Sequence, residues 1–249
     1  MWKVVIALVS YVIYVQGQTA NYCSTSLCSG SKHIACGNNG AFSSTCRSGR
    51  TIVDLGSYKN LIVDKHNTYR NKLASGSMKF KPASRMATMQ WDDELAKLAV
   101  LNVKQCVMKH DACRNTDRFK WSGQNLAWRW GRPAPSAEAS IIGGIDSWFN
   151  EYKDATQANL DKYSSTKAVI GHFTAMVNDR NTRVGCGMLR QPKDNGAEFF
   201  FACNYAQTNI LNRPIYVSGT AASKCTKGKN SKYPALCAAS EPINPNFIP

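Results

Sequence analysis

The sequence has few acidic residues and lacks the motifs of two large enzyme classes. Its 249 residues include 16 Asp and Glu against 31 Lys and Arg, which gives a formal net charge of +15. It contains no Gly-x-Ser-x-Gly, the nucleophile elbow of serine hydrolases, and no Gly-x-x-x-x-Gly-Lys, the loop that cradles nucleotide phosphates. These absences argue against both classes of enzyme.

The chain also lacks the Cys-x-x-Cys spacing of zinc fingers, although it has ten cysteines. An even number of cysteines in a secreted chain favours disulfides over metal thiolates. An oxidised sulfur cannot act as a nucleophile. The sequence therefore predicts five disulfides and no catalytic cysteine.

Beyond its first residues the chain has no apolar run of about 20 residues, the length needed to span a bilayer. Residues 1–17 combine Lys3, an apolar stretch and the small residue Gly17, which is the pattern of a secretory signal peptide. Cleavage is expected after Gly17, with Ala20 as the alternative. We therefore expect a secreted, extracellular protein without a membrane span.

The excess of basic residues favours polyanionic partners. Sulfated glycans, phospholipid surfaces and nucleic acid all offer such charge, and secretion makes nucleic acid the least favoured of the three. The alternative is that the basic charge only promotes solubility.

Composition divides the mature chain into three parts. Residues 18–56 hold four cysteines and few aliphatic residues, so this N-terminal cap must be tied down by disulfides. Residues 57–216 are long enough for one domain with a real core. Residues 217–249 form a basic extension in which Cys225 and Cys237 are close enough to bond each other. A solvated extension is favoured here over a contact with an anionic surface.

Apolar spacing within the central domain predicts four helices and three strands. The helices are expected at 57–74, at 92–106, after the capping residue Ser136, and at 172–178. The strands are expected at 124–130, 183–190 and 198–206. Helices and strands alternate without a regular βαβ repeat, so the pattern predicts the α+β class with a three-layer α-β-α sandwich.

Six short segments together resemble the motifs of the CAP superfamily (cysteine-rich secretory proteins, antigen 5 and pathogenesis-related proteins). They are 106–110 (CVMKH), 123–127 (GQNLA), 148–151 (WFNE), 171–177 (GHFTAMV), 183–187 (RVGCG) and 199–205 (FFFACNY). The resemblance covers about residues 57–216 and the cap. The cap and the Gly-Gln-Asn variant point to the antigen 5 branch, which is known from arthropod venom and saliva.

The resemblance implies a CAP sandwich and most of the disulfide pairing. By analogy with antigen 5 proteins, the expected bonds are Cys23–Cys36, Cys28–Cys113, Cys46–Cys106 and Cys186–Cys203. The fifth bond, Cys225–Cys237, rests on proximity in the sequence alone.

The resemblance also implies a central cleft lined by two histidines and two acids. Matched motif by motif, these positions are His110, His172, Glu151 and Gln124. Imidazoles and carboxylates bind divalent ions such as zinc, so His110, Glu151 and His172 form the candidate metal set. Gln124 replaces the second acid, which weakens metal binding and acid–base chemistry, although its amide can still fix a histidine tautomer. The alternative is that His110 is a hydrogen-bonded structural residue; no cofactor is required in either case.

The third predicted helix carries an apolar face that has two interpretations. Its members are Ile141, Ile145, Trp148, Phe149 and Tyr152. They line a groove for a small hydrophobic ligand, as CAP proteins do for lipids, or they are ordinary core, which is favoured for most of them. The pair Gly143–Gly144 is unfavourable in a helix by about 1 kcal/mol per glycine relative to alanine, so we expect a close contact there.

The resemblance favours binding over catalysis. The site has no nucleophile, and a metal-water mechanism would need Glu151 to be ligand and base at once. We assign no catalytic residue and expect a monomeric, non-enzymatic salivary or venom protein, an allergen that scavenges a small lipid or mediator or interacts with the host. The alternatives are binding to anionic glycan or protein surfaces and, less favoured, metal-dependent hydrolysis.

Overall fold

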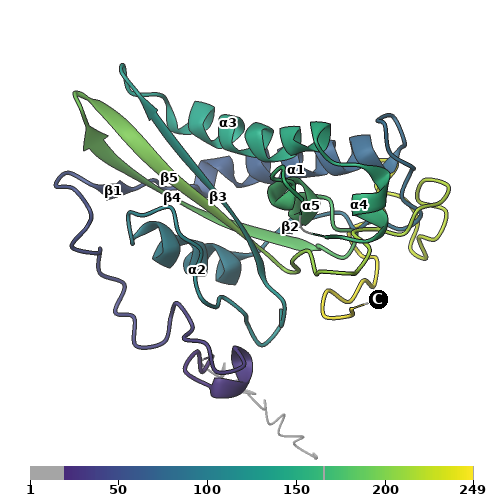
Figure 1. Ribbon diagram of the computed structural model, residues 1–249, viewed down its shortest axis with the longest axis horizontal. Coiled ribbons are helices and arrows are strands. Elements are labelled where there is room, and N and C mark those ends of the chain that lie inside the picture. The colour runs from purple at the N-terminus through teal and green to yellow at the C-terminus, as the bar shows by residue number, and fades with distance from the viewer. Residues whose placement is uncertain (1–19, 165, 249) are drawn as a thin grey trace, which may run out of the picture.

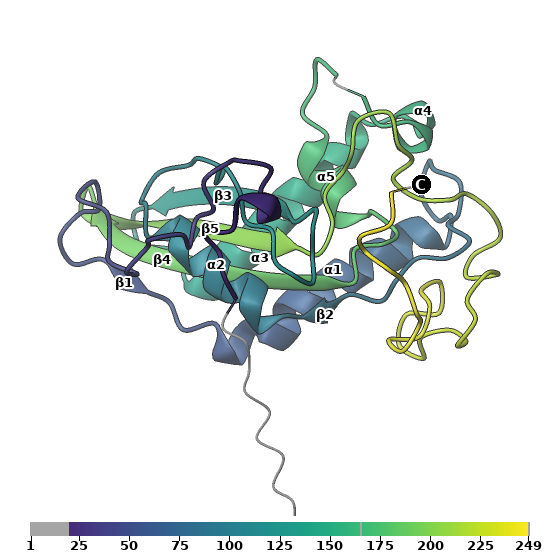
Figure 2. The same cartoon turned by 90° about the horizontal axis from the view of Figure 1, so that it is seen from below.

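The computed structural model describes residues 20–164 and 166–248, so the expected signal peptide at 1–17 lies outside the described residues. The chain forms three layers, with α1 and α3 on one face of a sheet and α2 on the other (Figures 1 and 2). The α-helices are α1 (Lys59–Ala74), α2 (Asp93–Val103), α3 (Ala137–Asn150), α4 (Gln157–Asp161) and α5 (Gly171–Met176). The strands are β1 (Thr51–Ile52), β2 (Gln90–Trp91), β3 (Gly123–Gly131), β4 (Arg183–Lys193) and β5 (Gly196–Tyr205). The predicted α-β-α sandwich of the α+β class is confirmed.

The helices begin where their sequences provide caps. The Asp92 side chain accepts a hydrogen bond from the backbone N–H of Leu95 at the start of α2, at 3.0 Å. Ser136 accepts one from Ala139 at the start of α3, also at 3.0 Å. Each bond satisfies a donor that the first helical turn would leave unpaired. The elements that were not predicted, α4, β1 and β2, have two to five residues, too few to show a period.

The sheet is built around the long β4–β5 hairpin. The strand order is β1-β4-β5-β3, and β2 pairs in parallel with one end of β4. Asp194 and Asn195 both have positive φ at the hairpin turn, a conformation that matches the twist of the two strands. Cys186 lies directly opposite Cys203 in the antiparallel register, and the two are joined by a disulfide.

The main core lies between the sheet and the helices α1 and α3. Trp148 of α3 stacks on Phe201 of β5 with ring centroids 5.4 Å apart. A Cβ at Gly144 would lie 3.1 Å from the Ala127 Cβ and 3.2 Å from the Phe201 ring. The expected close contact at the glycine pair is therefore present, because α3 packs tightly over β3 and β5 at this point.

On the other face, α2 lies directly on β4. A Cβ at Gly185 would come within 2.3 Å of the backbone of α2, and one at Gly187 within 2.6 Å. Backbone atoms cannot move aside as a flexible side chain can, so only glycine fits at both positions. These two glycines belong to the RVGCG segment.

Replacing Gly185 by alanine should destabilise the fold by about 3 kcal/mol or more, because the new methyl group would overlap the α2 backbone. Urea unfolding of the variant measures the change. Gly171→Ala is the control, since its Cβ would meet nothing closer than 3.6 Å. Equal stability of the Gly185 variant and the wild type would contradict the close packing of α2.

Five disulfides staple the chain, and all ten cysteines are bonded. The bonds are Cys23–Cys36, Cys28–Cys113, Cys46–Cys106, Cys186–Cys203 and Cys225–Cys237, the pairing expected from the sequence. Two of them tie the cap to the segment after α2. Disulfides that close long loops stabilise a fold by restricting the unfolded chain.

The C-terminal segment is not the solvated extension that its composition favours. Leu236 and Cys237 are fully buried, and Tyr233 joins the main core. The backbone N–H of Cys237 donates to the Met86 carbonyl at 2.8 Å. The prediction was wrong because a few apolar residues close together are enough to dock a segment whose average composition is polar and basic.

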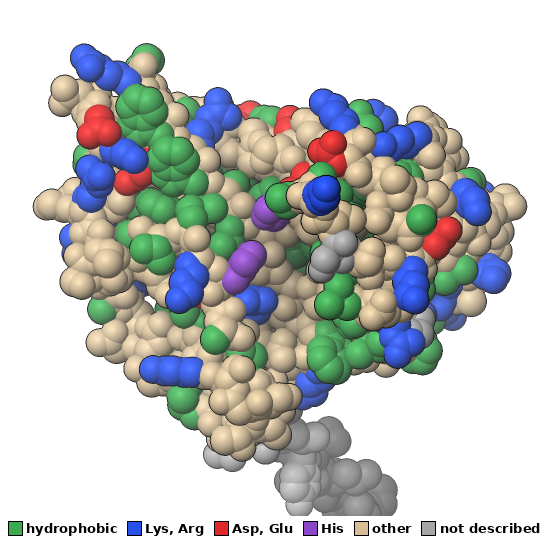
Figure 3. Space-filling view, in the orientation of Figure 1, with side chains coloured by type: hydrophobic (Ala, Val, Ile, Leu, Met, Phe, Trp, Pro, Cys, Tyr) green, Lys and Arg blue, Asp and Glu red, His purple; other side chains and the backbone are tan. Residues whose placement is uncertain are grey.

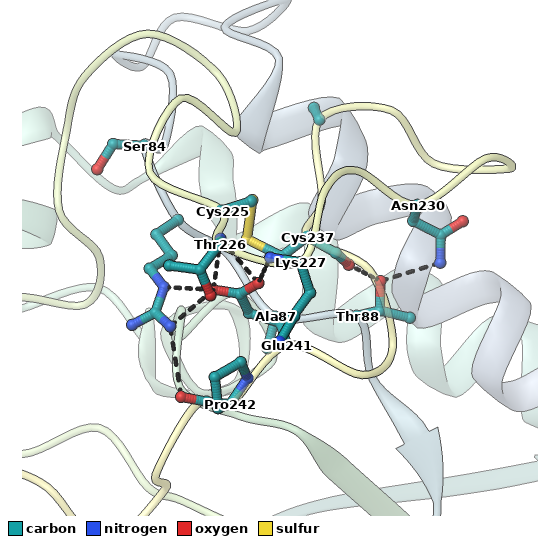
Figure 4. The surroundings of a disulfide bond; sticks show 12 residues. Ser84, Ala87, Thr88, Cys225, Thr226, Lys227, Asn230, Cys237, Glu241 and Pro242 are labelled. Atoms are coloured by element: carbon teal, nitrogen blue, oxygen red, sulfur yellow. Dashed lines mark hydrogen bonds and ion pairs between the residues drawn. A yellow bond between two sulfur atoms is a disulfide. The ribbon is translucent and has the colours of Figure 1, made fainter.

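Glu241 fastens this segment to the domain (Figure 4). Its carboxylate accepts hydrogen bonds from the backbone N–H groups of Thr226 and Lys227 at 2.8 to 3.0 Å, and it pairs with Arg85 at 2.6 Å. Burial opposes ionisation of Glu241, but these donors outweigh it and lower its pKa to about 2.

Glu241→Gln should lower the free energy of unfolding at neutral pH by about 2 kcal/mol, since it removes charge-assisted hydrogen bonds from a buried group. Because the pKa is depressed from 4.5 to about 2, this stabilisation is complete above pH 4.5 and is lost as the pH falls through 2. Wild type and variant should therefore converge in acid, as measured by urea unfolding. Asp117→Asn, which breaks the exposed pair with Lys120, is the control and should change little at any pH. A gap that persists at pH 2 would refute this account.

Candidate functional site

A cleft of about 340 Å³ opens beside the carboxyl end of β5 and the start of α5. Its lining residues are His110, Arg114, Gln124, Asn125, Tyr163, Val169, Gly171, His172, Ala175, Thr208 and Asn209. Figure 3 shows histidine side chains at the edge of this hollow. Both predicted histidines and Gln124 therefore meet in one place, although they come from a loop, a helix and a strand.

Gln124 orients the imidazole of His110 through a hydrogen bond to its Nδ1 atom. His110 Nδ1 lies 2.8 Å from Gln124 Oε1. The amide nitrogen of Gln124 donates to Asp111 Oδ2 at 2.7 Å and to Asn204 Oδ1 at 2.9 Å. Because the amide nitrogen faces two oxygens, its oxygen faces the imidazole, and Nδ1 of His110 must carry the proton.

Glu151 holds His172 in the same way. Its Oε1 accepts a hydrogen bond from His172 Nδ1 at 2.5 Å, and its Oε2 accepts one from the backbone N–H of Phe173 at 3.0 Å. Glu151 begins the 3₁₀ turn directly after α3, and His172 is the second residue of α5. The carboxylate thus links the end of one helix to the start of another.

Both imidazoles therefore present Nε2 to the cleft. No described residue forms a hydrogen bond with either Nε2 atom. Burial lowers the pKa of His110 and outweighs the hydrogen bond to Gln124, which raises it, and the nearby charge of Arg114 lowers it further. His110 is therefore neutral at pH 7, with an unprotonated Nε2.

Glu151 and His172 meet as expected, but Glu151 lies behind the imidazole, and both of its oxygens are already occupied. Within residues 20–164 and 166–248, no group of three or more His, Cys, Asp and Glu side chains is arranged to hold a metal ion. The cleft therefore contains two imidazole Nε2 atoms, and the Nδ1 atom of each ring is hydrogen-bonded to Gln124 or to Glu151. Such partners fix the tautomer of metal-binding histidines, yet a catalytic zinc site uses three protein ligands.

A buried polar chain behind the cleft was not foreseen from the sequence. Asn125 donates to the His172 carbonyl at 3.1 Å and to the Tyr205 hydroxyl at 3.2 Å. That hydroxyl lies 2.9 Å from Nε2 of His66, whose pKa burial lowers to about 4. His66 is therefore a neutral structural residue, linked to α5 through Tyr205 and Asn125. No motif or residue spacing in the sequence predicts this role.

The apolar face of α3 does not line a groove. Ile141, Ile145, Trp148 and Phe149 are almost completely buried in the main core, and Tyr152 packs against them. The core interpretation of these residues therefore describes the structure. A separate apolar pocket of about 170 Å³ lies between α3 and β3, but its walls are other residues, including Phe199 and Trp128.

A second hollow lies on the other side of His110. Its volume is about 550 Å³, and it runs between the cap and the segment after α2. Its walls include the basic residues Lys32 and Lys109 and the amides of Asn38 and Asn39. His110 therefore borders two hollows at once.

Replacing Gln124 by glutamate, the residue the motif leads one to expect, should destabilise this protein by about 2 kcal/mol at pH 7. The new carboxylate would stand beside that of Asp111, which the amide now reaches at 2.7 Å, and two adjacent carboxylates cannot both be ionised without cost. Urea unfolding at pH 7 and at pH 4 measures the effect, which should shrink in acid. Gln124→Met is the control, because it removes the hydrogen bonds without adding charge and should show no such pH dependence. A glutamate variant as stable as the wild type would refute the role given to the amide.

A disulfide-stapled α-β-α sandwich with two histidines in its cleft is the architecture that the sequence motifs implied. The profile of the CAP (cysteine-rich secretory protein) family matches residues 63–205, and the chain belongs to this family. Within the described residues, no helix is long and apolar enough to cross a membrane.

The chain is similar to proteins named venom allergen and antigen 5 like allergen. It is 39% identical over 244 residues to Venom allergen-1 of Aedes aegypti, covering 96% of each chain. It is 44% identical over 196 residues to the antigen 5 like allergen Cul n 1 of Culicoides nubeculosus, covering 74% of this chain and 88% of that protein. Among solved structures it resembles NaASP2 with Zn2+, with a TM-score of 0.62 and 25% identity over 78% of this chain and 100% of that one.

Proposed function

We propose that this protein is secreted and acts by binding, without catalysis, as a CAP protein of the venom and saliva type. The relatives named venom allergen and antigen 5 support this role. Five disulfides also support it, because such bonds persist in oxidising surroundings outside the cytosol.

The lining of the cleft supports binding over catalysis. None of its described side chains is a serine or a cysteine. The one threonine, Thr208, donates its hydroxyl to the Asn209 amide at 3.1 Å and contacts no base. A hydroxyl without a base is a weak nucleophile.

The two Nε2 atoms determine what the cleft can recognise. A neutral imidazole nitrogen with a lone pair coordinates a divalent ion or accepts a hydrogen bond. His110 and His172 would hold such an ion, with Gln124 and Glu151 fixing their orientation. Bound zinc would supply a positive centre that attracts anionic groups. Two protein ligands make a weak site, so the ion is a ligand of the cleft and not a structural cofactor.

Zinc titrated into the purified protein should bind one ion per chain with micromolar or weaker affinity, as measured by calorimetry. His110→Ala and His172→Ala should each abolish the binding, because each removes half of the ligand set. Tyr163→Phe is the control, since it alters the lining without touching an imidazole. Zinc binding that survives both histidine variants would overturn the assignment.

Native mass spectrometry of protein purified from its source separates the remaining alternatives. A lipid-sized mass retained by the wild type would favour scavenging of a lipid, and the pocket between α3 and β3 would then have to widen, because ligand pockets usually measure about 300 Å³ or more. Zinc-stimulated hydrolysis that disappears in the His172→Ala variant would overturn the non-enzymatic role.

A further inference from the structure

The sheet face that α2 covers is left open at the far end of the β4–β5 hairpin. Side chains alternate along each strand, so β3 places Leu126, Trp128 and Trp130 on the α2 face. α2 packs over Gly185 and Gly187, and the strands continue past it to their turn. The ends of β3, β4 and β5 project beyond the helices (Figure 1).

Two tryptophans occupy this projecting end, which we call the tryptophan tip (Trp128, Trp130, Lys193 and Glu198). Trp128 is 45% exposed and Trp130 is 42% exposed. The indole N–H of Trp128 donates to Glu198 Oε2 at 2.8 Å, and that of Trp130 donates to the Lys193 carbonyl at 3.3 Å. The surface left to solvent is therefore ring carbon, which offers a partner no hydrogen bond.

Glu198 fixes the arrangement from below. Its nearly buried carboxylate also accepts a hydrogen bond from Gln191 at 2.8 Å, and it pairs with Lys193 at 3.4 Å and with Arg47 of the cap at 3.5 Å. The Lys193 ammonium lies 4.8 Å from the centre of the Trp128 ring. The rings and the cations are thus held together as one surface.

The surroundings of the tip are basic. Arg47 and Arg132 are exposed, and Arg50 is partly exposed. Asp194, at the turn of the hairpin, is an exposed acid, whereas the carboxylate of Glu198 is paired with Arg47 and Lys193. Figure 3 shows hydrophobic side chains gathered among charged ones over this end of the sheet.

We propose that the tryptophan tip docks on the surface of an anionic phospholipid bilayer. Tryptophan rings favour the boundary between headgroups and acyl chains, and basic residues beside them are attracted to anionic lipids. Because the tryptophan tip projects from the molecule, its exposed rings can insert into this boundary of a flat bilayer without a clash from the rest of the protein. The net charge of +15 brings the protein toward such a surface before the rings make contact.

Vesicles of phosphatidylcholine with and without phosphatidylserine test the proposal, using cosedimentation of the mature full chain and its tryptophan emission. The protein should bind the vesicles that contain phosphatidylserine, its emission should shift to shorter wavelength, and added salt should weaken the binding. The double variant Trp128→Ala, Trp130→Ala should bind at least about tenfold more weakly. Lys193→Glu, which keeps both rings, should also weaken binding.

Trp121→Ala is the matched control, because Trp121 is equally exposed at 45% but lies at the opposite end of β3. Its loss should leave vesicle binding unchanged. No binding to phosphatidylserine vesicles, or an equal loss in the Trp121 variant and the double variant, would overturn the proposal. Retention on immobilised heparin through the same two tryptophans, without vesicle binding, would assign the tip to a glycan and would also overturn it.

Discussion

The contact between the α2 backbone and β4 positions both the cleft and the N-terminal cap. Because Gly185 and Gly187 have no side chains, α2 settles directly on the strand. The segment that leaves α2 then passes over β3, where it carries His110 to Gln124. The same segment holds Cys106 and Cys113, to which the cap is bonded. One close approach of two backbones thus places a histidine in the cleft and anchors the N-terminal cap.

The long elements could be predicted because each has a recognisable apolar pattern: α1 repeats its buried residues at helical spacing, and β5 is a short, nearly continuous apolar run. The sequence could not place the C-terminal segment, since docking there depends on Leu236 and Cys237 finding a partner surface far away in the chain. For the cleft, motif resemblance brought His110, His172 and Glu151 together. It could not show that Glu151 stands behind His172, because that depends on where a turn after α3 meets α5.

The structural role of Gln124 becomes clear only from the residues to which it is hydrogen-bonded. Considered without its neighbours, Gln124 is only an uncharged replacement for the acidic residue of the motif. In the fold, Asp111 and Asn204 supply oxygens that need a donor, and His110 needs an acceptor. An amide offers both at one position without ionising, so Gln124 pairs with His110, Asp111 and Asn204 and adds no second negative charge beside Asp111.

The two glycines of the RVGCG segment, Gly185 and Gly187, are required by the packing of the fold and not by the cleft. They are dictated by how near a helix comes to a strand, and they touch nothing that enters the cleft. A motif of this kind reflects the packing of the fold, so related proteins can retain it while they bind entirely different ligands. Family membership that is recognised through such residues therefore indicates a shared fold. The ligand specificity of each member depends on the residues that line its own cleft.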